Sequence, residues 1–132
     1  MVKIAINGFG RIGRLCFRET FGSDDFEVVA INDLTSVEDL YFLLKYDSNF
    51  RMFDAEGLTY DEEGLILKGR KIKVYSEKDP INLPWDMLNI DVVLECTGKF
   101  LKLMDASMHI KAGAKKVLIS APGKDDMKTI VY

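Results

Sequence analysis

The chain has 132 residues, of which 48% are hydrophobic and 30% are charged, and 18 basic against 21 acidic side chains leave a formal net charge of −3. This length and composition suit one globular domain and exclude disordered and collagen-like proteins. No apolar run approaches the roughly 20 residues of a bilayer-spanning helix, and mild acidity gives no general attraction to nucleic acid. We therefore expect a cytoplasmic protein with neither a membrane nor a nucleic acid as its partner.

Apolar runs of strand length alternate along the chain with segments whose apolar residues recur every three or four positions. This alternation predicts an α/β fold, in which helices cover a parallel sheet. In chain order the pattern predicts a strand at 2–6, a helix at 12–19, a strand at 26–31, a helix at 37–44, a strand at 91–95, a helix at 103–112, and parallel strands at 116–120 and 129–132.

Helix ends are marked by capping residues. Thr35 and Ser36 are each followed three residues later by an acidic side chain, so either residue can open a capping box at the start of the second helix. Gly22 after the first helix and Gly113 after the third suit a left-handed C-cap.

The stretch 57–75 interrupts the alternation with strand-like runs at 58–60, 65–67 and 71–75, which polar turns separate. These runs predict a small antiparallel meander inserted between the parallel strands. Turns at Asp79-Pro80 and Leu83-Pro84 then lead into the strand at 91–95.

Gly8, Gly10 and Gly13 spell G-x-G-x-x-G directly after the first strand and at the start of the first helix. In this fingerprint the first glycine permits a tight turn, the second lets the backbone approach a diphosphate, and the third lets the helix pack close to the strand. The amides of Arg11 and Ile12 would then hold the diphosphate at the helix N-terminus. The motif in this context predicts a Rossmann-type, doubly wound fold that binds a dinucleotide.

Asp33 ends the second strand 20 residues after the last glycine of the motif. A carboxylate at this position can accept the ribose hydroxyls of adenosine. The same carboxylate would repel a 2′-phosphate, and no Arg or Lys occurs at 34–37 to neutralise it, so we expect NAD rather than NADP. The alternative role for Asp33 is a helix cap, although Thr35 and Ser36 already serve that purpose.

Small residues follow the third and fourth predicted parallel strands, at 96–98 and 120–123. They fall at the carboxyl edge of the sheet, where open α/β sheets bind ligands. Both segments could line a nucleotide cleft, or they could be strand-to-helix turns without a ligand.

Four segments, KIAINGFGRIGR at 3–14, AINDL at 30–34, ECTG at 95–98 and KAGAKKVLISAP at 111–122, together resemble glyceraldehyde-3-phosphate dehydrogenase. The resemblance covers the whole chain and implies one NAD-binding domain over residues 1–132. It implies contacts to the diphosphate from Asn7, Gly8, Gly10, Arg11, Ile12 and Gly13. It further implies contacts to the ribose from Asn32 and Asp33, to adenine from Lys78, and to the adenosine and nicotinamide halves from Thr97, Gly98 and Ser120.

One segment departs from the family pattern. Residues 47–53 read DSNFRMF, where the family usually has Asp-Ser-x-His-Gly-x-aromatic. The missing glycine removes a position suited to positive φ, and Phe50 adds an apolar ring that could pack under the loop or against another subunit.

The resemblance implies a homotetrameric parent enzyme that oxidises an aldehyde through a cysteine thioester, with a histidine base, hydride transfer to NAD and phosphorolysis. The family's nucleophile lies in a Ser-Cys-Thr-Thr-Asn type segment, which does not occur here. We expect no catalytic residue and no metal site in this chain. Cys16 and Cys96 stand in unrelated contexts and are expected to be reduced, buried thiols, and His109 is expected on a helix surface.

The final apolar run reaches Tyr132 without a polar tail, so we expect the N-terminal part of a two-domain enzyme, inactive without its catalytic domain. Two alternatives remain open. Erythrose-4-phosphate dehydrogenase shares this cofactor-domain pattern, and a free-standing nucleotide-binding or interaction module could use the basic stretch 111–116 to contact nucleic acid or protein.

Overall fold

Strands and helices alternate in the computed structural model, which describes residues 2–21, 25–46, 57–67, 69–97, 103–119 and 130–131. The strands are β1 (Val2–Asn7), β2 (Phe26–Asn32), β3 (Thr59–Tyr60), β4 (Gly64–Leu67), β5 (Arg70–Tyr75), β6 (Val92–Glu95), β7 (Lys116–Ile119) and β8 (Ile130–Val131). The helices are α1 (Arg11–Phe21), α2 (Val37–Lys45), the short 3₁₀ helix η1 (Pro80–Asn82) and α3 (Leu103–Lys111).

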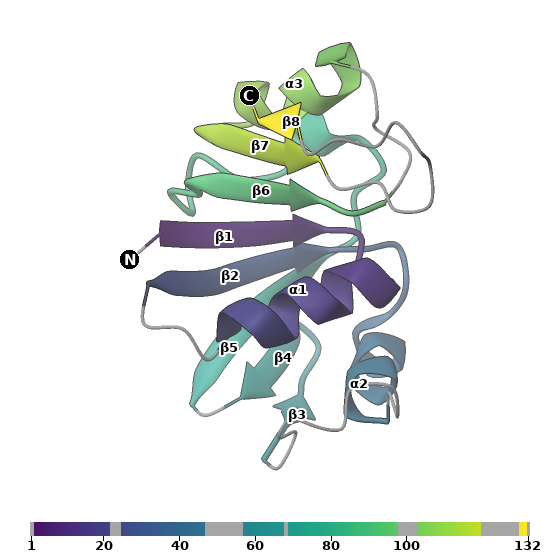
Figure 1. Cartoon of the computed structure of the whole chain (residues 1–132). Helices are drawn as coiled ribbons and strands as arrows, with labels where there is room; N and C mark the ends of the chain where they lie inside the picture. Colours follow the sequence, from purple (N-terminus) through teal and green to yellow (C-terminus); the bar gives the residue numbers. More distant parts are fainter. Residues whose placement is uncertain are drawn as a thin grey trace.

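The described strands form one sheet in the order β3-β4-β5-β2-β1-β6-β7-β8 (Figure 1). Five neighbouring strands, β5, β2, β1, β6 and β7, run parallel to one another. The chain winds away from β1 through β2 and β5, and then resumes on the other side of β1 with β6 and β7. The predicted doubly wound, mostly parallel α/β fold is confirmed, and its winding direction reverses between β1 and β6.

The predicted meander is confirmed, because β3, β4 and β5 pair antiparallel. It extends one edge of the sheet, however, since β5 also pairs parallel with β2. At the other edge the prediction of a fifth parallel strand is wrong, because β8 pairs antiparallel with β7. A parallel neighbour needs a crossover of roughly a dozen residues or more, and the connection at 120–129 is shorter than that.

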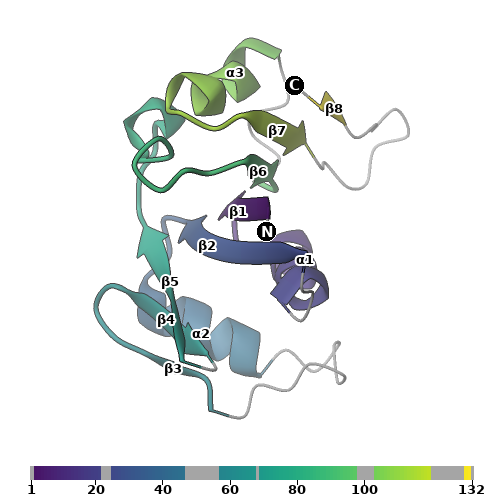
Figure 2. The same cartoon turned by 90° about the vertical axis from the view of Figure 1, so that its left-hand side faces the viewer.

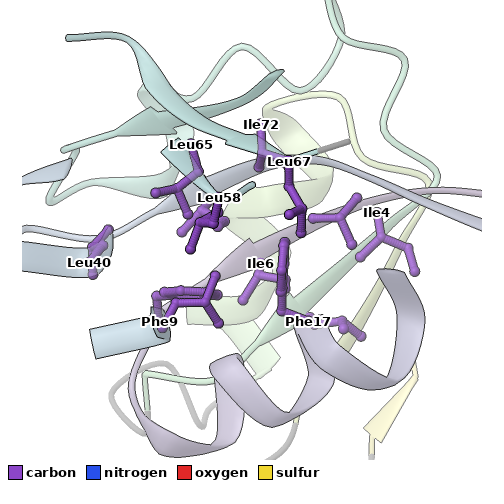
Figure 3. Packing of buried hydrophobic residues seen from close by; sticks show 13 residues of the cluster. Ile4, Ile6, Phe9, Phe17, Leu40, Leu58, Leu65, Leu67 and Ile72 are labelled. Atoms are coloured by element: carbon purple, nitrogen blue, oxygen red, sulfur yellow. The ribbon is translucent and has the colours of Figure 1, made fainter. Parts of the chain in front are cut away.

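Helices α1 and α2 cover one face of the sheet, whereas η1 and α3 lie on the opposite face (Figure 2). Side chains that alternate along β1 supply both layers, since Ile4 and Ile6 point into the first core and Ala5 into the second. Figure 3 shows the first core, in which the buried residues are Ile4, Ile6, Phe9, Phe17, Val28, Ile31, Leu40, Leu44, Leu58, Leu65, Leu67, Ile72 and Leu94.

The second core forms around Trp85, which is fully buried. Small residues of β1 and β2, Ala5 and Ala30, belong to this core together with larger side chains of the strands β6 and β7. The Trp85 ring stacks on His109 of α3 and meets the ring of Tyr75 edge to face. The segment after η1 is therefore anchored between the sheet and α3 by one large aromatic side chain.

The ends of the helices settle the predicted caps. Ser36 is the N-cap of α2, because its hydroxyl accepts a hydrogen bond from the Asp39 amide at 3.2 Å. Gly113 follows α3 with φ of 120°, as predicted for a left-handed cap, whereas Gly22 lies outside the described residues. Among the described residues, no helix is both long and apolar enough to cross a membrane.

Candidate functional site

A pocket of about 490 Å³ lies at the carboxyl ends of the parallel strands, where the winding direction reverses. Open α/β sheets bind their ligands at this switch point, and the volume falls in the usual range for small-molecule sites. Its lining comes from the ends of β1, β2, β5 and β6 and comprises Asn7, Gly8, Gly10, Asn32, Asp33, Leu34, Glu77, Lys78, Cys96 and Thr97.

The glycines of the fingerprint shape the rim of this pocket between β1 and α1. Gly8 has φ of 94°, and a Cβ on it would lie 2.7 Å from the Thr97 methyl group. A Cβ on Gly13 would lie 2.1 Å from the Gly8 carbonyl oxygen, so the helix packs against the strand end as predicted. Gly10, by contrast, has no heavy atom within 4 Å of its Cβ position and leaves the backbone open to a ligand.

Asp33 connects the glycine loop to the segment before α2. Its Oδ2 accepts a hydrogen bond from the Phe9 amide at 2.7 Å, and its Oδ1 accepts one from the Thr35 amide at 2.9 Å. The helix cap itself is Ser36, so the alternative role of Asp33 as a cap is wrong. A carboxylate oxygen has two lone pairs, and each Asp33 oxygen can therefore still accept a ribose hydroxyl.

Asn32 holds the segment after β5 against the end of β2. Its amide oxygen accepts a hydrogen bond from the Glu77 amide, and its nitrogen donates to the Glu77 carbonyl, both at 2.9 Å. The same nitrogen donates to Oδ1 of Asn7 at 2.8 Å. The two hydrogen bonds between Asn32 and Glu77 place Glu77 and Lys78 on the pocket wall. Of these two residues, the sequence had indicated only Lys78 as part of the site.

Glu95 lies at the end of β6 with its carboxylate completely buried below the pocket. Its Oε2 accepts hydrogen bonds from Asn7 Nδ2 and His109 Nε2, both at 2.7 Å. Its Oε1 accepts from the Thr97 amide at 3.1 Å and from the Thr97 hydroxyl at 2.6 Å. An ionised carboxylate only accepts, so it can take all four donors and hold Asn7 and Thr97 in place at the pocket.

The prediction that His109 lies on a helix surface is wrong, because the side chain is fully buried. Trp85 Nε1 donates a hydrogen bond to His109 Nδ1 at 3.0 Å. An indole nitrogen is only a donor, so Nδ1 must accept and the ring hydrogen sits on Nε2, which donates to Glu95. The sequence signal for this arrangement was a glutamate at the end of an apolar strand that is covered on both faces. A carboxylate buried there needs hydrogen-bond donors.

The two cysteines were expected to be buried thiols, and the structure shows both only partly buried. Cys16 of α1 and Cys96 after β6 are both half-buried and pack against the first core. Interaction with the Cys96 thiol, opposed by burial, lowers the pKa of Cys16. The same interaction, together with burial, raises the pKa of Cys96.

The structure brings most of the predicted cofactor contacts to the pocket, namely Asn7, Gly8, Gly10, Asn32, Asp33, Lys78 and Thr97. Arg11 and Ile12 open α1 beside Gly10, and Gly13 packs behind the loop, so these three do not line the pocket. Leu34 lines the pocket but was not predicted. Gly98, Ser120 and the divergent segment 47–53 lie outside the described residues.

Comparison with known proteins agrees with this geometry. The family model described as glyceraldehyde 3-phosphate dehydrogenase, NAD binding domain, matches residues 2–103. The glyceraldehyde-3-phosphate dehydrogenase of Clostridium acetobutylicum is 54% identical over 132 residues, which are 100% of this chain and 39% of that protein. The enzyme of the same name from Mycoplasma pneumoniae is 50% identical over 99% of this chain and 39% of its own length. That from Geobacillus stearothermophilus is 51% identical over 98% of this chain and 38% of its own length.

Proposed function

This chain belongs to the glyceraldehyde-3-phosphate dehydrogenase family as its NAD-binding domain, and on that premise we propose that it holds the cofactor of a phosphorylating aldehyde dehydrogenase. The chain spans about two fifths of the length of the curated relatives it matches. In this proposal residues 1–132 form the NAD domain, while the cysteine nucleophile and histidine base belong to a catalytic domain outside this chain.

The shape and chemistry of the pocket support the assignment of its lining to NAD. The diphosphate is assigned to the open backbone at Gly10 and to the amides of Arg11 and Ile12 at the start of α1, a helix N-terminus that favours anions. The adenosine ribose is assigned to Asp33, whose oxygens retain acceptor capacity. When bound, NAD supplies the hydride acceptor, and this chain's residues hold and orient it.

The remaining contacts complete the proposed site. Asn7, Gly8 and Gly13 shape the diphosphate turn, and Asn32 supports the ribose side through its bonds to Asn7 and Glu77. The other proposed contacts are Lys78 toward adenine and Thr97, Gly98 and Ser120 along the two halves of the cofactor. The proposal also includes a homotetrameric parent enzyme and a cytoplasmic location. Free thiols, such as the two of this chain, are typical of cytoplasmic proteins.

The observation that carries the assignment is the half-buried carboxylate of Asp33 on the pocket wall, and isothermal titration with NAD and NADP tests it. A charge-assisted hydrogen bond contributes roughly 1.5 to 3 kcal/mol, so Asp33→Asn should weaken NAD binding by about 10- to 100-fold. It should weaken NADP binding less, because the mutation also removes repulsion from the 2′-phosphate. Asp39→Asn makes the same charge change on α2, outside the pocket lining, and should bind NAD like the original chain.

A second experiment tests whether the nucleophile lies outside this chain. We expect no NADH production when purified chain 1–132 is mixed with glyceraldehyde 3-phosphate, NAD and inorganic phosphate. Measurable turnover that Cys96→Ser abolishes would refute the assignment of the nucleophile to a domain outside this chain.

A further inference from the structure

His109 lies outside the pocket lining, and its ring is held in one orientation behind the pocket. The side chain is fully buried on α3, and its ring stacks on the Trp85 ring with 6.3 Å between the two ring centroids. Trp85 Nε1 donates a hydrogen bond to His109 Nδ1 at 3.0 Å. Stacking and hydrogen bond together fix the ring, so its Nε2 hydrogen points to one acceptor, Oε2 of Glu95.

Three polar side chains form a row at the carboxyl ends of β2, β1 and β6. Asn7 is in register with Asn32 on one side and with Glu95 on the other. Alternate residues of a strand point to opposite faces, and the residue before each of these three belongs to the first core. The row therefore faces the opposite layer, where η1 and α3 cover the sheet (Figure 2).

Hydrogen bonds run along this row and begin at His109. Glu95 Oε2 accepts from His109 Nε2 and from Asn7 Nδ2, both at 2.7 Å. Asn7 gives its nitrogen to Glu95, and its Oδ1 consequently faces Asn32 Nδ2 at 2.8 Å. The other oxygen of Glu95 accepts the amide and the hydroxyl of Thr97. Asn7, Asn32 and Thr97 line the pocket, so the donor on α3 is connected to three lining residues.

We propose that His109 is a positioning residue for the cofactor and acts through Glu95 on Asn7 and Thr97, a role that rests on the proposed NAD pocket. The terminal torsion of a glutamate is broad, so its rotamer alone does not fix where the two carboxylate oxygens point. The Nε2 hydrogen of His109 binds one of these oxygens and sets the orientation in which the carboxylate receives the donors of the pocket residues.

Loss of the Nε2 hydrogen has a defined consequence. Glu95 is fully buried, so bulk water does not supply a replacement donor. The carboxylate then turns toward its remaining donors, which belong to Asn7 and Thr97, and changes the positions of both. The loss therefore reaches cofactor binding as well as stability. A histidine that only filled the second core would affect stability alone.

The variants His109→Gln and His109→Asn separate these two roles, because the histidine is neutral here and each variant keeps one of its two hydrogen bonds. Glutamine carries its amide nitrogen as far from the backbone as Nε2 and can donate to Glu95. Asparagine carries its amide oxygen as far out as Nδ1 and can accept from Trp85. Titration with NAD should show binding about 2- to 10-fold weaker for His109→Asn than for His109→Gln, the factor that one hydrogen bond contributes.

Lys111→Gln and Lys111→Asn are the matched controls, because Lys111 is exposed at the end of the same helix. They carry the same difference in helix propensity and should bind NAD alike. All titrations are made well below the thermal unfolding midpoints, so that differences in stability do not enter. Equal affinities of the two His109 variants, or weaker binding by His109→Gln, would refute the positioning role. No binding by the original chain would refute the proposed function and this role with it.

A measurement on the original chain tests the same role when the variants do not fold. Addition of NAD to the ¹⁵N-labelled chain should shift the Nε2–H signal of His109, since this hydrogen binds the carboxylate that holds two lining residues. The amide signal of Gly69, in the turn between β4 and β5, should stay in place. A His109 signal that does not move at saturating NAD would overturn the coupling between α3 and the pocket.

Discussion

The buried carboxylate of Glu95 offers the sharpest test of how the pocket is held, through the substitution Glu95→Gln. The amide nitrogen of glutamine must replace one carboxylate oxygen. In the place of Oε2 it would face two donors at 2.7 Å, on Asn7 and His109. In the place of Oε1 it would face the Thr97 amide, while the Thr97 hydroxyl can turn and accept. The second orientation costs less, although it sets a glutamine N–H against the part-buried Thr97 amide, donor against donor.

The cost follows from these contacts. An orphaned buried donor costs about 1 to 3 kcal/mol, and the three remaining hydrogen bonds become neutral instead of charge-assisted. Burying an amide is cheaper than burying a charge, which offsets part of that loss. We therefore expect Glu95→Gln to lower the free energy of unfolding by about 2 to 3 kcal/mol, a large share of the roughly 5 to 15 kcal/mol of a typical domain.

Urea unfolding followed by tryptophan fluorescence measures this effect, since Trp85 is the single tryptophan and donates to His109. Glu62→Gln is the matched control on an exposed glutamate and should change the free energy of unfolding by less than about 0.5 kcal/mol. Equal stabilities of the two variants would refute Glu95 as an ionised acceptor of four hydrogen bonds. A ¹⁵N spectrum of the original chain should independently show the hydrogen of His109 on Nε2.

Two further predictions concern the glycine loop and the start of β1. Gly8→Ala should destabilise the fold by about 1 to 3 kcal/mol more than Gly69→Ala. Both positions have positive φ, but only a Cβ on Gly8 meets Thr97. Equal shifts of the thermal unfolding temperature in the two variants would contradict this prediction. Hydrogen bonds from the Lys3 amide and from the Lys115 ammonium lower the pKa of Asp91. Asp91 therefore stabilises the fold at pH values above the pKa of the unfolded carboxyl. This stabilisation is lost as the pH falls through the folded pKa of Asp91. The free energies of unfolding in urea should therefore differ between Asp91→Asn and the original chain at pH 7 and converge in acid. A difference that grows in acid would contradict the sign of this linkage.

Features that depend on neighbouring residues were predictable from the sequence. Hydrophobic periodicity located the strands and helices, and the glycine spacing located the turn between β1 and α1. The spacing from that turn to Asp33 placed a carboxylate at the end of β2, where it lines the pocket. Each of these signals is read within about 20 residues, since strands, helices and turns follow from local geometry.

Strand direction at the edge of the sheet was harder to predict. An apolar run indicates a strand but carries no information about its partner's direction, and the sequence therefore misassigned β8 as parallel. The connection at 120–129 is shorter than the crossover that a parallel pair needs, and this length decides that β8 runs antiparallel to β7.

The amino-acid sequence by itself determined the α/β class, the glycine turn and the position of Asp33, because these depend on spacing along the chain. Only the tertiary structure decided that Asn7, Glu95 and His109 share one hydrogen-bonded network, since Asn7 and Glu95 are 88 residues apart. The same holds for Cys16 of α1 and Cys96 after β6, which pack against the same core. Polar side chains and thiols from distant segments leave no periodic signal, and their partners are set by how the sheet and helices pack.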